Sequence, residues 1–324
     1  MEFSLLAGVI HKFIESIEVS IMAVYVNTNV SSLNGRRYLN NVQNQLTTTY
    51  QRLSSGMRIN SAKDDAAGLQ IADRLTTQIN GLNQGNRNSN DAIALAQTME
   101  GALDETTNML QKIRTLAVQA SNGTNTAEDR KALQQEVTSL SIEINRIAQQ
   151  TKFGGQNILL SANEGLIDAD GNITFQVGAN KGDEIVLSGF SAGFTMSGIG
   201  TIANIKAEDA TKSGWFIDQG LTMGRWSVSV ADSAKATLAN IDKFIAAVDG
   251  KRAELGAFQN RLESSIRNQA NVSANQADAR SRIRDADFAE ESAALSQQSI
   301  IQQAATSMLM QANSRPQLAL SMLG

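Results

Sequence analysis

Apolar residues recur at helical spacing along most of this chain. Leucines are seven residues apart from Leu39 to Leu53, and between Ala92 and Ala120 the apolar positions alternate four and three apart. The same alternation returns at 133–147 and at 238–266. This spacing places one narrow apolar stripe on each helix, and such a stripe needs a partner helix to cover it. The pattern predicts a mainly helical protein built from long paired helices.

The stripes near the two ends of the chain are thinner than those in its middle. They consist of Leu39, Val42, Leu46 and Leu53 near the N-terminus and of Ile301, Ala305, Met308 and Ala312 near the C-terminus. A helix that buries so little apolar surface is not stable alone. We therefore expect the two ends to pair with each other as a thin coiled coil.

Two polar stretches, Leu53–Ile71 and 278–291, interrupt the helical pattern at matching distances from the two ends. Their prominent charged residues are Arg58, Asp64, Asp65, Arg282, Arg284, Asp285 and Asp287. We expect the two stretches to form one connector, which the chain passes on its way out and again on its way back. Charge runs of this kind are commonly solvated or paired, so ion pairs between helices or subunits are the expected role of these side chains.

The hydrophobic period changes in the middle of the chain. Apolar residues alternate at 173–177 and at 185–187 around a Gly-containing turn, which predicts a β-hairpin. Residues 189–231 are rich in Gly and Ser and are interpreted as a loop or hairpin insert. An Asn-rich run at 83–90 weakens the helical pattern. Gly123 is expected to end the long helix in the left-handed conformation, and Thr126 to cap the next one.

These elements define the predicted fold class and its organisation. The fold is mainly α, a long antiparallel helical bundle or coiled coil formed by the N- and C-terminal halves, with a β-hairpin region and a small central insert. The predicted parts are an extension at 1–22, an inner terminal coiled coil from 23–64 and 285–324, a helical bundle with the hairpin from 65–188 and 232–284, and an outer insert at 189–231. The extension is too charged for a membrane span and lacks the basic start of a secretory signal.

The amino-acid composition argues against most kinds of catalytic, metal-binding and nucleic-acid-binding site. The chain has no Cys, one His (His11) and one Pro (Pro316), with a net charge of −4. Without Cys there is no thiolate chemistry, and a single His leaves no His-cluster metal site and no catalytic triad. A mildly acidic chain argues against a nucleic-acid binder. We expect no cofactor, no metal, no membrane insertion and no enzymatic activity.

Two features invite a chemical interpretation and are set aside. Gly198–Ala203 matches a dinucleotide-binding glycine pattern, but no βαβ pattern surrounds it, so flexible turn glycines are the better interpretation. The carboxylates of the connector could in principle hold a metal or act as an acid–base pair. Each group has basic neighbours, which favours ion pairing instead.

Several long motifs carry a resemblance to a known family. They are Leu53–Ile71, ETTNMLQKIRTLAVQASNGTN at 105–125, FGGQNIL at 153–159, ARSRIRDADFAEE at 279–291 and the LSMLG ending. Together they resemble bacterial flagellins, in a short form with a small outer region. The resemblance covers about 22–190 and 232–324, so the mature chain is expected to begin near Ala23.

The resemblance implies a structural role. Flagellins polymerise into the extracellular flagellar filament, with terminal helices that order on assembly. The implied partners are further copies of the chain, the flagellar cap and hook–filament junction proteins, an export chaperone and the flagellar type III export apparatus. A flagellin-sensing Toll-like receptor is a further implied partner. No role with nucleic acid or in a membrane is implied.

The positions that match the receptor-contact motif are Gln111, Lys112, Arg114, Leu116, Gln119 and Glu136, beside Leu110 at a core position. Lys112 stands where sensed flagellins usually carry Arg, and the two differ at a bidentate site. These polar residues also suit a solvated helix face or filament packing. A different class of function remains open, a helical adaptor that binds other proteins through its terminal coiled coils.

Overall fold

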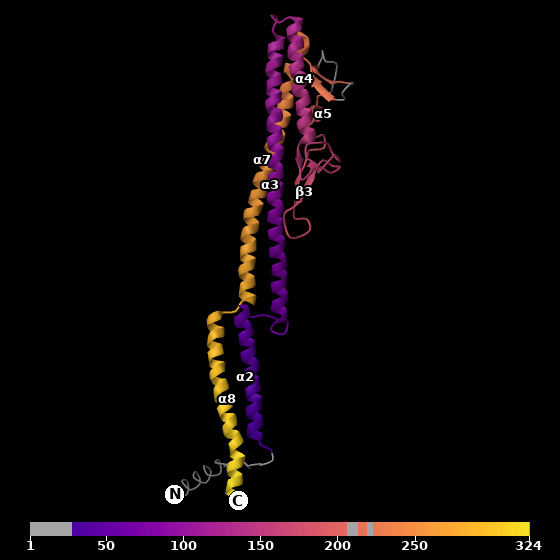
Figure 1. The fold of residues 1–324 in the computed structure, drawn as a ribbon. Helices are drawn as coiled ribbons and strands as arrows, with labels where there is room; N and C mark the ends of the chain where they lie inside the picture. The colour runs from indigo at the N-terminus through magenta and orange to yellow at the C-terminus, as the bar shows by residue number, and fades with distance from the viewer. Residues whose placement is uncertain (1–27, 206–212, 219–222, 324) are drawn as a thin grey trace, which may run out of the picture. The chain divides into compact units, whose positions relative to one another are not determined.

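The computed structural model describes residues 28–205, 213–218 and 223–323 (Figure 1). These residues belong to two compact units. Unit 1 is the chain up to Ala72 together with Arg280–Gly324, and unit 2 is Asp73–Ala279. Both boundaries fall inside long helices, whereas the sequence pattern suggested boundaries at the connector. The predicted extension at 1–22 lies outside the described residues, and the division into four parts stays a prediction.

Unit 2 is built on long antiparallel helices. They are α3 (Ala66–Ser121), α4 (Ala127–Gln150) and α7 (Ala231–Arg284). α3 and α7 run side by side through the unit, and α4 lies beside the C-terminal part of α3 (Figure 1). Their apolar stripes meet in one core, in which Leu110 of α3, Ile144 of α4 and Leu255 of α7 are fully buried. The predicted fold class, a helical bundle formed by both halves of the chain, is confirmed.

Polar residues at stripe positions join α7 to α3. Arg252 Nη2 lies 2.7 Å from Asp104 Oδ1, and Gln259 Nε2 donates to Glu100 Oε2 at 2.9 Å. A shift of one helix along the other would leave these half-buried groups without partners, which is costly. The two contacts therefore hold the register of the pair.

The Asn-rich run does not weaken α3, which continues through it without a break. The run is instead the docking site of the predicted hairpin, formed by β3 (Ile173–Gln176) and β4 (Glu184–Leu187). Asn88 Nδ2 donates to the Gln176 carbonyl at 2.9 Å. A Cβ added at Gly85 would overlap the carbonyl oxygen of Val177, so only glycine permits this approach. Polar and small residues here serve the hairpin, which a helical pattern alone does not reveal.

A second, smaller hairpin follows α4. It joins β1 (Lys152–Phe153) to β2 (Gln156–Asn157) through Gly154 and Gly155. Their φ values are 57° and 84°. Two successive residues with positive φ make a tight two-residue hairpin turn, which requires glycines or similar residues. The Phe153-Gly-Gly sequence thus ends α4 by reversing the chain.

The turn between α3 and α4 differs from the prediction for Gly123. Gly123 is not among the glycines with positive φ, so the predicted left-handed C-cap is wrong. A side chain caps the end of α3 instead, since Arg130 Nε donates to the Ala120 carbonyl at 2.9 Å. Thr126 forms the predicted N-cap of α4, in a reciprocal capping box with Asp129.

The insert at 189–231 adds to the core of unit 2. It contains α5 (Met196–Ile202) and the antiparallel pair β5 (Trp215–Asp218) and β6 (Met223–Trp226). Trp215 and Trp226 are buried against Phe244 of α7, with ring centroids 5.1 Å and 4.7 Å from that of Phe244. Edge-on aromatic contacts of this kind hold the insert to the helices.

The Gly198–Ala203 motif lies largely within α5, and its glycines are not flexible turn residues. A Cβ at Gly198 would overlap the Ala192 carbonyl oxygen, and one at Gly200 would lie 3.3 Å from Phe244. The pattern therefore reflects close packing of a short helix. This corrects the expectation from sequence.

Unit 1 consists mainly of two antiparallel helices, α2 (Val30–Ser55) and α8 (Phe288–Leu323), which lie side by side (Figure 1). α2 ends at Gly56, whose φ of 69° is the left-handed C-cap that glycine favours. Along the chain, the connector joins α2 to α3 and α7 to α8.

Candidate assembly surface

The α2–α8 pair has almost no hydrophobic core. Among the side chains of unit 1 that the structure describes, the buried apolar ones are Val42, Ile59, Ala72 and Ala305, while the large buried cluster belongs to unit 2. The helices approach closely at Gly35, where an added Cβ would lie 3.1 Å from Leu309 Cδ1. Such a small buried area gives two long helices little stability of their own.

Polar contacts occupy much of the seam between α2 and α8. Thr49 Oγ1 donates to Gln298 Oε1 at 3.2 Å, and Arg52 Nη1 lies 3.1 Å from Glu291 Oε1. The net contribution of one hydrogen bond to folding stability is about 1 kcal/mol, and a partly exposed ion pair contributes less. These contacts set the register of the two helices more than they stabilise them.

Asn29 joins the start of α2 to the far end of α8. Its side-chain oxygen accepts the Ser32 N–H as the N-cap of α2. Its Nδ2 donates to the Ala312 carbonyl at 2.7 Å. Ala312 is four residues before Pro316, which has no N–H to bond that carbonyl. One side chain therefore caps one helix and satisfies the acceptor that proline leaves open in the other.

The structure places the predicted assembly residues on two surfaces. Val42 and Ala305 are buried in the seam, and Leu39, Leu46, Leu53, Ile301 and Ala312 are half-buried. Met308 is 71% exposed. The sequence pattern expected the next residue of the seam three positions after Ala305, at Met308. In the structure the side chain four positions after Ala305, Leu309, faces Gly35 of α2 instead. Met308 lies at the open edge of the seam, where its side chain is available to another molecule, and its role in assembly stays a prediction.

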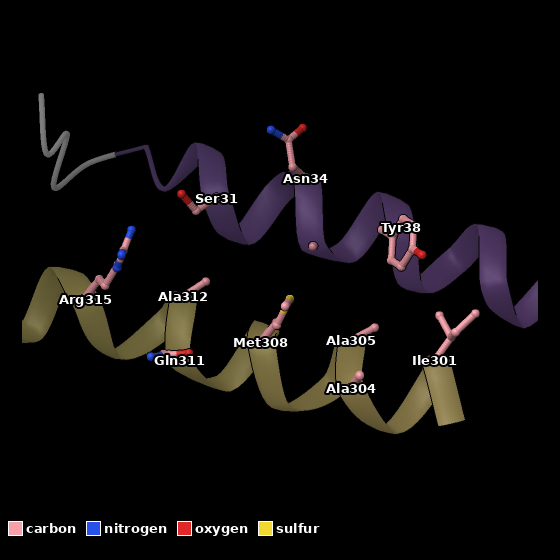
Figure 2. A pocket seen from close by; sticks show the side chains of 11 residues that line it. Ser31, Asn34, Tyr38, Ile301, Ala304, Ala305, Met308, Gln311, Ala312 and Arg315 are labelled. Carbon is pink, nitrogen blue, oxygen red and sulfur yellow. The ribbon is translucent and has the colours of Figure 1, made fainter. Parts of the chain in front are cut away.

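An open groove of about 770 Å³ runs along one side of the seam. Figure 2 shows Ile301, Ala305 and Met308 directed from α8 toward α2, with Tyr38 on the facing helix. Arg315 lies at one end of the groove. The lining is thus apolar over most of its length.

The same unit exposes large apolar side chains outside the groove. Ile300 is 66% exposed and Met310 68%, and Phe288 and Tyr50 are also exposed. The sequence between Glu291 and Arg315 contains no charged residue. Several large apolar side chains exposed on one uncharged stretch of helix mark a candidate protein contact. We call α2 and α8 with these residues the assembly surface.

The two polar stretches meet in unit 1 as one connector. The Arg58 backbone N–H donates to the Arg284 carbonyl at 2.7 Å, and the Ala286 N–H donates to the Gly56 carbonyl at 3.0 Å. The Arg58 guanidinium Nη2 also donates to the Ile283 carbonyl at 2.6 Å. The outgoing and returning strands of the connector are therefore tied by backbone hydrogen bonds. Ile59, 2% exposed, supplies their apolar anchor.

The connector carboxylates accept hydrogen bonds from backbone N–H groups and from serine hydroxyls, and the expected ion pairs of the connector between helices or subunits stay a prediction. Asp64 accepts the Ser61 N–H, the Ser61 hydroxyl and the Asn60 N–H, and these bonds hold its pKa below the usual value. Asp65 accepts the Gly68 N–H at the start of α3. Asp287 accepts the Ala289 N–H at the start of α8, Asp285 accepts the Ser281 hydroxyl, and Arg282 and Arg284 lie in the last turn of α7. These positions suit a role in stabilising helix ends and turns, and they do not indicate a catalytic site.

Five of the six positions that match the receptor-contact motif are exposed on α3 and α4, namely Gln111, Lys112, Arg114, Gln119 and Glu136. Lys112 Nζ lies 3.6 Å from Glu136 Oε1, and Arg114 Nε lies 2.7 Å from Asp242 Oδ1. Leu116 is only 3% exposed. It packs in the core as Leu110 does, so the expectation that it presents a contact side chain is wrong.

The described part of the chain shows no cluster of three or more metal-ligating side chains. Within the same residues, no helix is both long and apolar enough to cross a membrane.

The chain matches two family descriptions, the bacterial flagellin N-terminal helical region over 26–164 and the bacterial flagellin C-terminal helical region over 238–323. Flagellin B of Vibrio cholerae serotype O1 is 38% identical over 384 residues, covering 94% of this chain and 100% of the relative. Flagellin D of Vibrio anguillarum is 37% identical with the same coverage.

A solved structure, that of a putative flagellar hook-associated protein from Vibrio parahaemolyticus, is similar in fold. Its TM-score is 0.52 at 17% identity, and the match covers 68% of this chain and 100% of that one. Identity this low supports the fold alone. The matches to both terminal regions, with full-length relatives above one-third identity, show that the chain belongs to the bacterial flagellin family.

Proposed function

We propose that this flagellin polymerises into the extracellular flagellar filament through the assembly surface of unit 1. The observation that carries the proposal is the contrast between the units: unit 2 has a large core, whereas unit 1 leaves Tyr38, Ile300, Met308 and Met310 exposed. Burying each such side chain fully is worth about 1.5–3 kcal/mol. Copies of the chain supply the missing apolar partner, and the gain offsets the cost of ordering two long helices.

The experiment is polymerisation of purified chain on filament seeds. The monomer should be cleaved by protease near the two ends, within 28–58 and 285–323, because α2 and α8 bury too little to resist opening. After seeding, long filaments should form and both ends should become protected. An adaptor that binds other proteins through its coiled coil would instead have protease-resistant ends as a monomer and would form no filaments.

Export and filament growth involve further partners in this proposal. The chain passes unfolded through the flagellar type III export apparatus with an export chaperone, then meets the cap and hook–filament junction proteins. The absence of Cys and the single Pro suit this route, because no disulfide closes a loop and only one X–Pro bond slows refolding.

A second role, as ligand of the flagellin-sensing Toll-like receptor, rests on the exposed receptor-motif side chains of α3 and α4. Gln111, Lys112, Arg114, Gln119 and Glu136 project from rigid helices, and rigid scaffolds favour precise recognition. The Lys112–Glu136 and Arg114–Asp242 pairs hold these groups in place. Both pairs are largely exposed, so a partner can exchange them at low cost.

Replacing Arg114 or Glu136 with Ala should weaken receptor signalling by the monomer. Contact residues at the centre of an interface cost more than about 1 kcal/mol when truncated, so the half-maximal concentration should rise about fivefold to tenfold. Arg146→Ala is the matched control, since Arg146 is exposed on α4 and bonds to Glu143 and Gln150 on the same helix. Equal signalling by both test variants and the control would remove the receptor assignment.

A further inference from the structure

The turn between α3 and α4 contains an Asn–Gly pair in unusual surroundings. Asn122 and Gly123 are exposed and lie outside both helices. A Cβ added at Gly123 would meet no atom within 4 Å, so nothing crowds this peptide. Among the residues that the structure describes, no acceptor takes the Gly123 N–H. The nitrogen is thus free to react with a neighbouring electrophile.

The carbonyl oxygen of the same peptide is surrounded by donors. Arg130 Nη2 donates to the Asn122 oxygen at 3.1 Å, and the Asn125 N–H donates to it at 3.3 Å. When the Gly123 nitrogen loses its proton, the negative charge of the peptide resides largely on this oxygen. A guanidinium stabilises that charge far better than water-exposed backbone does. Arg130 is therefore placed to increase the acidity of the Gly123 N–H.

The Asn122 side chain turns back along the chain toward the Thr124 N–H. Its Oδ1 accepts the Thr124 N–H at 3.4 Å, an arrangement in which an Asn side chain mimics a backbone turn. The ring closed by this contact contains Asn122 Cγ and the Gly123 nitrogen. The Thr124 N–H also points at the oxygen that becomes negative if that nitrogen attacks Cγ, as an oxyanion donor does.

We propose that Asn122–Gly123 is a self-modifying site that converts to aspartate and isoaspartate with water as the only co-reactant. The deprotonated Gly123 nitrogen forms a bond to Asn122 Cγ. The Cγ–Nδ2 bond breaks, and the nitrogen leaves as ammonia after taking up protons from water. The resulting succinimide is opened by water, at the Cγ side to aspartate or at the main-chain carbonyl to isoaspartate. No electron transfer is involved, and Arg130 acts as a positioning residue.

Two other Asn–Gly pairs in the chain lack this arrangement. Asn34–Gly35 lies in α2 and Asn80–Gly81 in α3. In a helix the glycine N–H is bonded to the carbonyl four residues earlier, so the nitrogen is not available to the side chain. Gly81 is further covered by the hairpin, since an added Cβ would lie 2.6 Å from Ala179 Cβ. Asn80 and Asn122 are both exposed, so the two sites differ in the helical backbone and the hairpin cover at Gly81 and not in exposure of the Asn side chain.

The reaction changes the charge of the turn and, in the isoaspartate product, the length of its main chain. A carboxylate appears beside the C-terminal end of α3, where negative charge is unfavourable, and close to the Arg130 guanidinium, which offsets it. The isoaspartate form also adds a methylene to the main chain of the turn. Folded chains of different age would thus differ at one loop while the core of unit 2 is unchanged.

The test is peptide mapping by mass spectrometry of full-length chain aged at mildly alkaline pH. Asn122 should be converted to aspartate and isoaspartate at least about tenfold faster than Asn80, because Asn80 must wait for local opening of α3. Asn122 should also react at least as fast in the native chain as in denaturant, since the fold supplies the donors. Conversion of Asn80 alongside Asn122, or a native rate well below the denatured one, would overturn the proposal.

Variants isolate the role of the guanidinium. Arg130→Gln should slow the conversion of Asn122 about fivefold in the native chain and leave its rate in denaturant unchanged. Arg130→Lys should recover part of the rate, and Arg146→Gln, elsewhere on α4, should have no effect. If Arg130→Gln reacts as fast as the parent, or faster, the donors around Asn122 do not assist the reaction.

Discussion

Replacing Met308 with Asp should abolish filament formation while leaving the monomer folded. Met308 is 71% exposed and contributes little to the α2–α8 seam, so the charge costs the free chain almost nothing. In the filament the same position would lie against another copy. The substitution removes the about 1.5–3 kcal/mol that a buried Met contributes and introduces a carboxylate without a partner. Together these exceed about 3 kcal/mol, which corresponds to a rise in critical concentration of at least about a hundredfold.

The measurement is seeded polymerisation followed by sedimentation, with circular dichroism of the monomer as a check on folding. Ile217→Asp is the matched control, because Ile217 is 46% exposed on β5, in the predicted outer insert. This control should polymerise normally. Normal filaments from Met308→Asp would show that the exposed face of α8 is not a subunit contact, whatever surface the filament uses.

Replacing Gly85 with Ala should destabilise unit 2 by about 2–4 kcal/mol or detach the β3–β4 hairpin. The added methyl group overlaps the Val177 carbonyl, and a backbone neighbour cannot rotate away as a side chain can. Moving the hairpin aside would also break the bond from Asn88 to Gln176. Urea unfolding followed by tryptophan fluorescence measures the loss, because both Trp residues of the chain lie in unit 2.

Gly101→Ala, in the same helix, should have the opposite effect on stability. No atom lies within 4 Å of a Cβ at Gly101, which is a solvent-exposed helix position. Replacement should stabilise the unit by about 0.5–1 kcal/mol, since alanine loses less backbone entropy than glycine. A Gly85→Ala variant as stable as Gly101→Ala, with unchanged amide exchange in β3, would show that the hairpin does not dock against this glycine.

In α3, one prediction from sequence was right and another was wrong. The stripe at 92–120 identified α3, because a regular apolar period is a property of the helix alone. The Asn-rich run before it was taken as a weakening, although α3 is continuous there. Its small and polar residues are suited to a hairpin that lies about ninety residues later in sequence. No local pattern carries that information.

The candidate surfaces show the same division. Membership of a helix was predictable for Met308 and for Leu116, but their exposure was not. Met308 is exposed, whereas the next residue, Leu309, is half-buried and lies against Gly35 of α2. Leu116 is buried because α3 meets partners on more than one side in unit 2, which widens its buried face beyond a two-position stripe.

By itself, the sequence determined the long helices, the hairpin, the connector and the absence of thiol chemistry, since each depends on local period, turn residues or composition. It also contained the motifs that resemble flagellins. Only the tertiary structure decided which face of each helix is covered, how the connector carboxylates are used, and why glycine stands at 85. These depend on which distant backbone or side chain lies opposite, and that partner is chosen by packing of the whole unit. The exposed face of α8 is the clearest case, because a sequence stripe marks an apolar surface but does not say whether the same chain covers it.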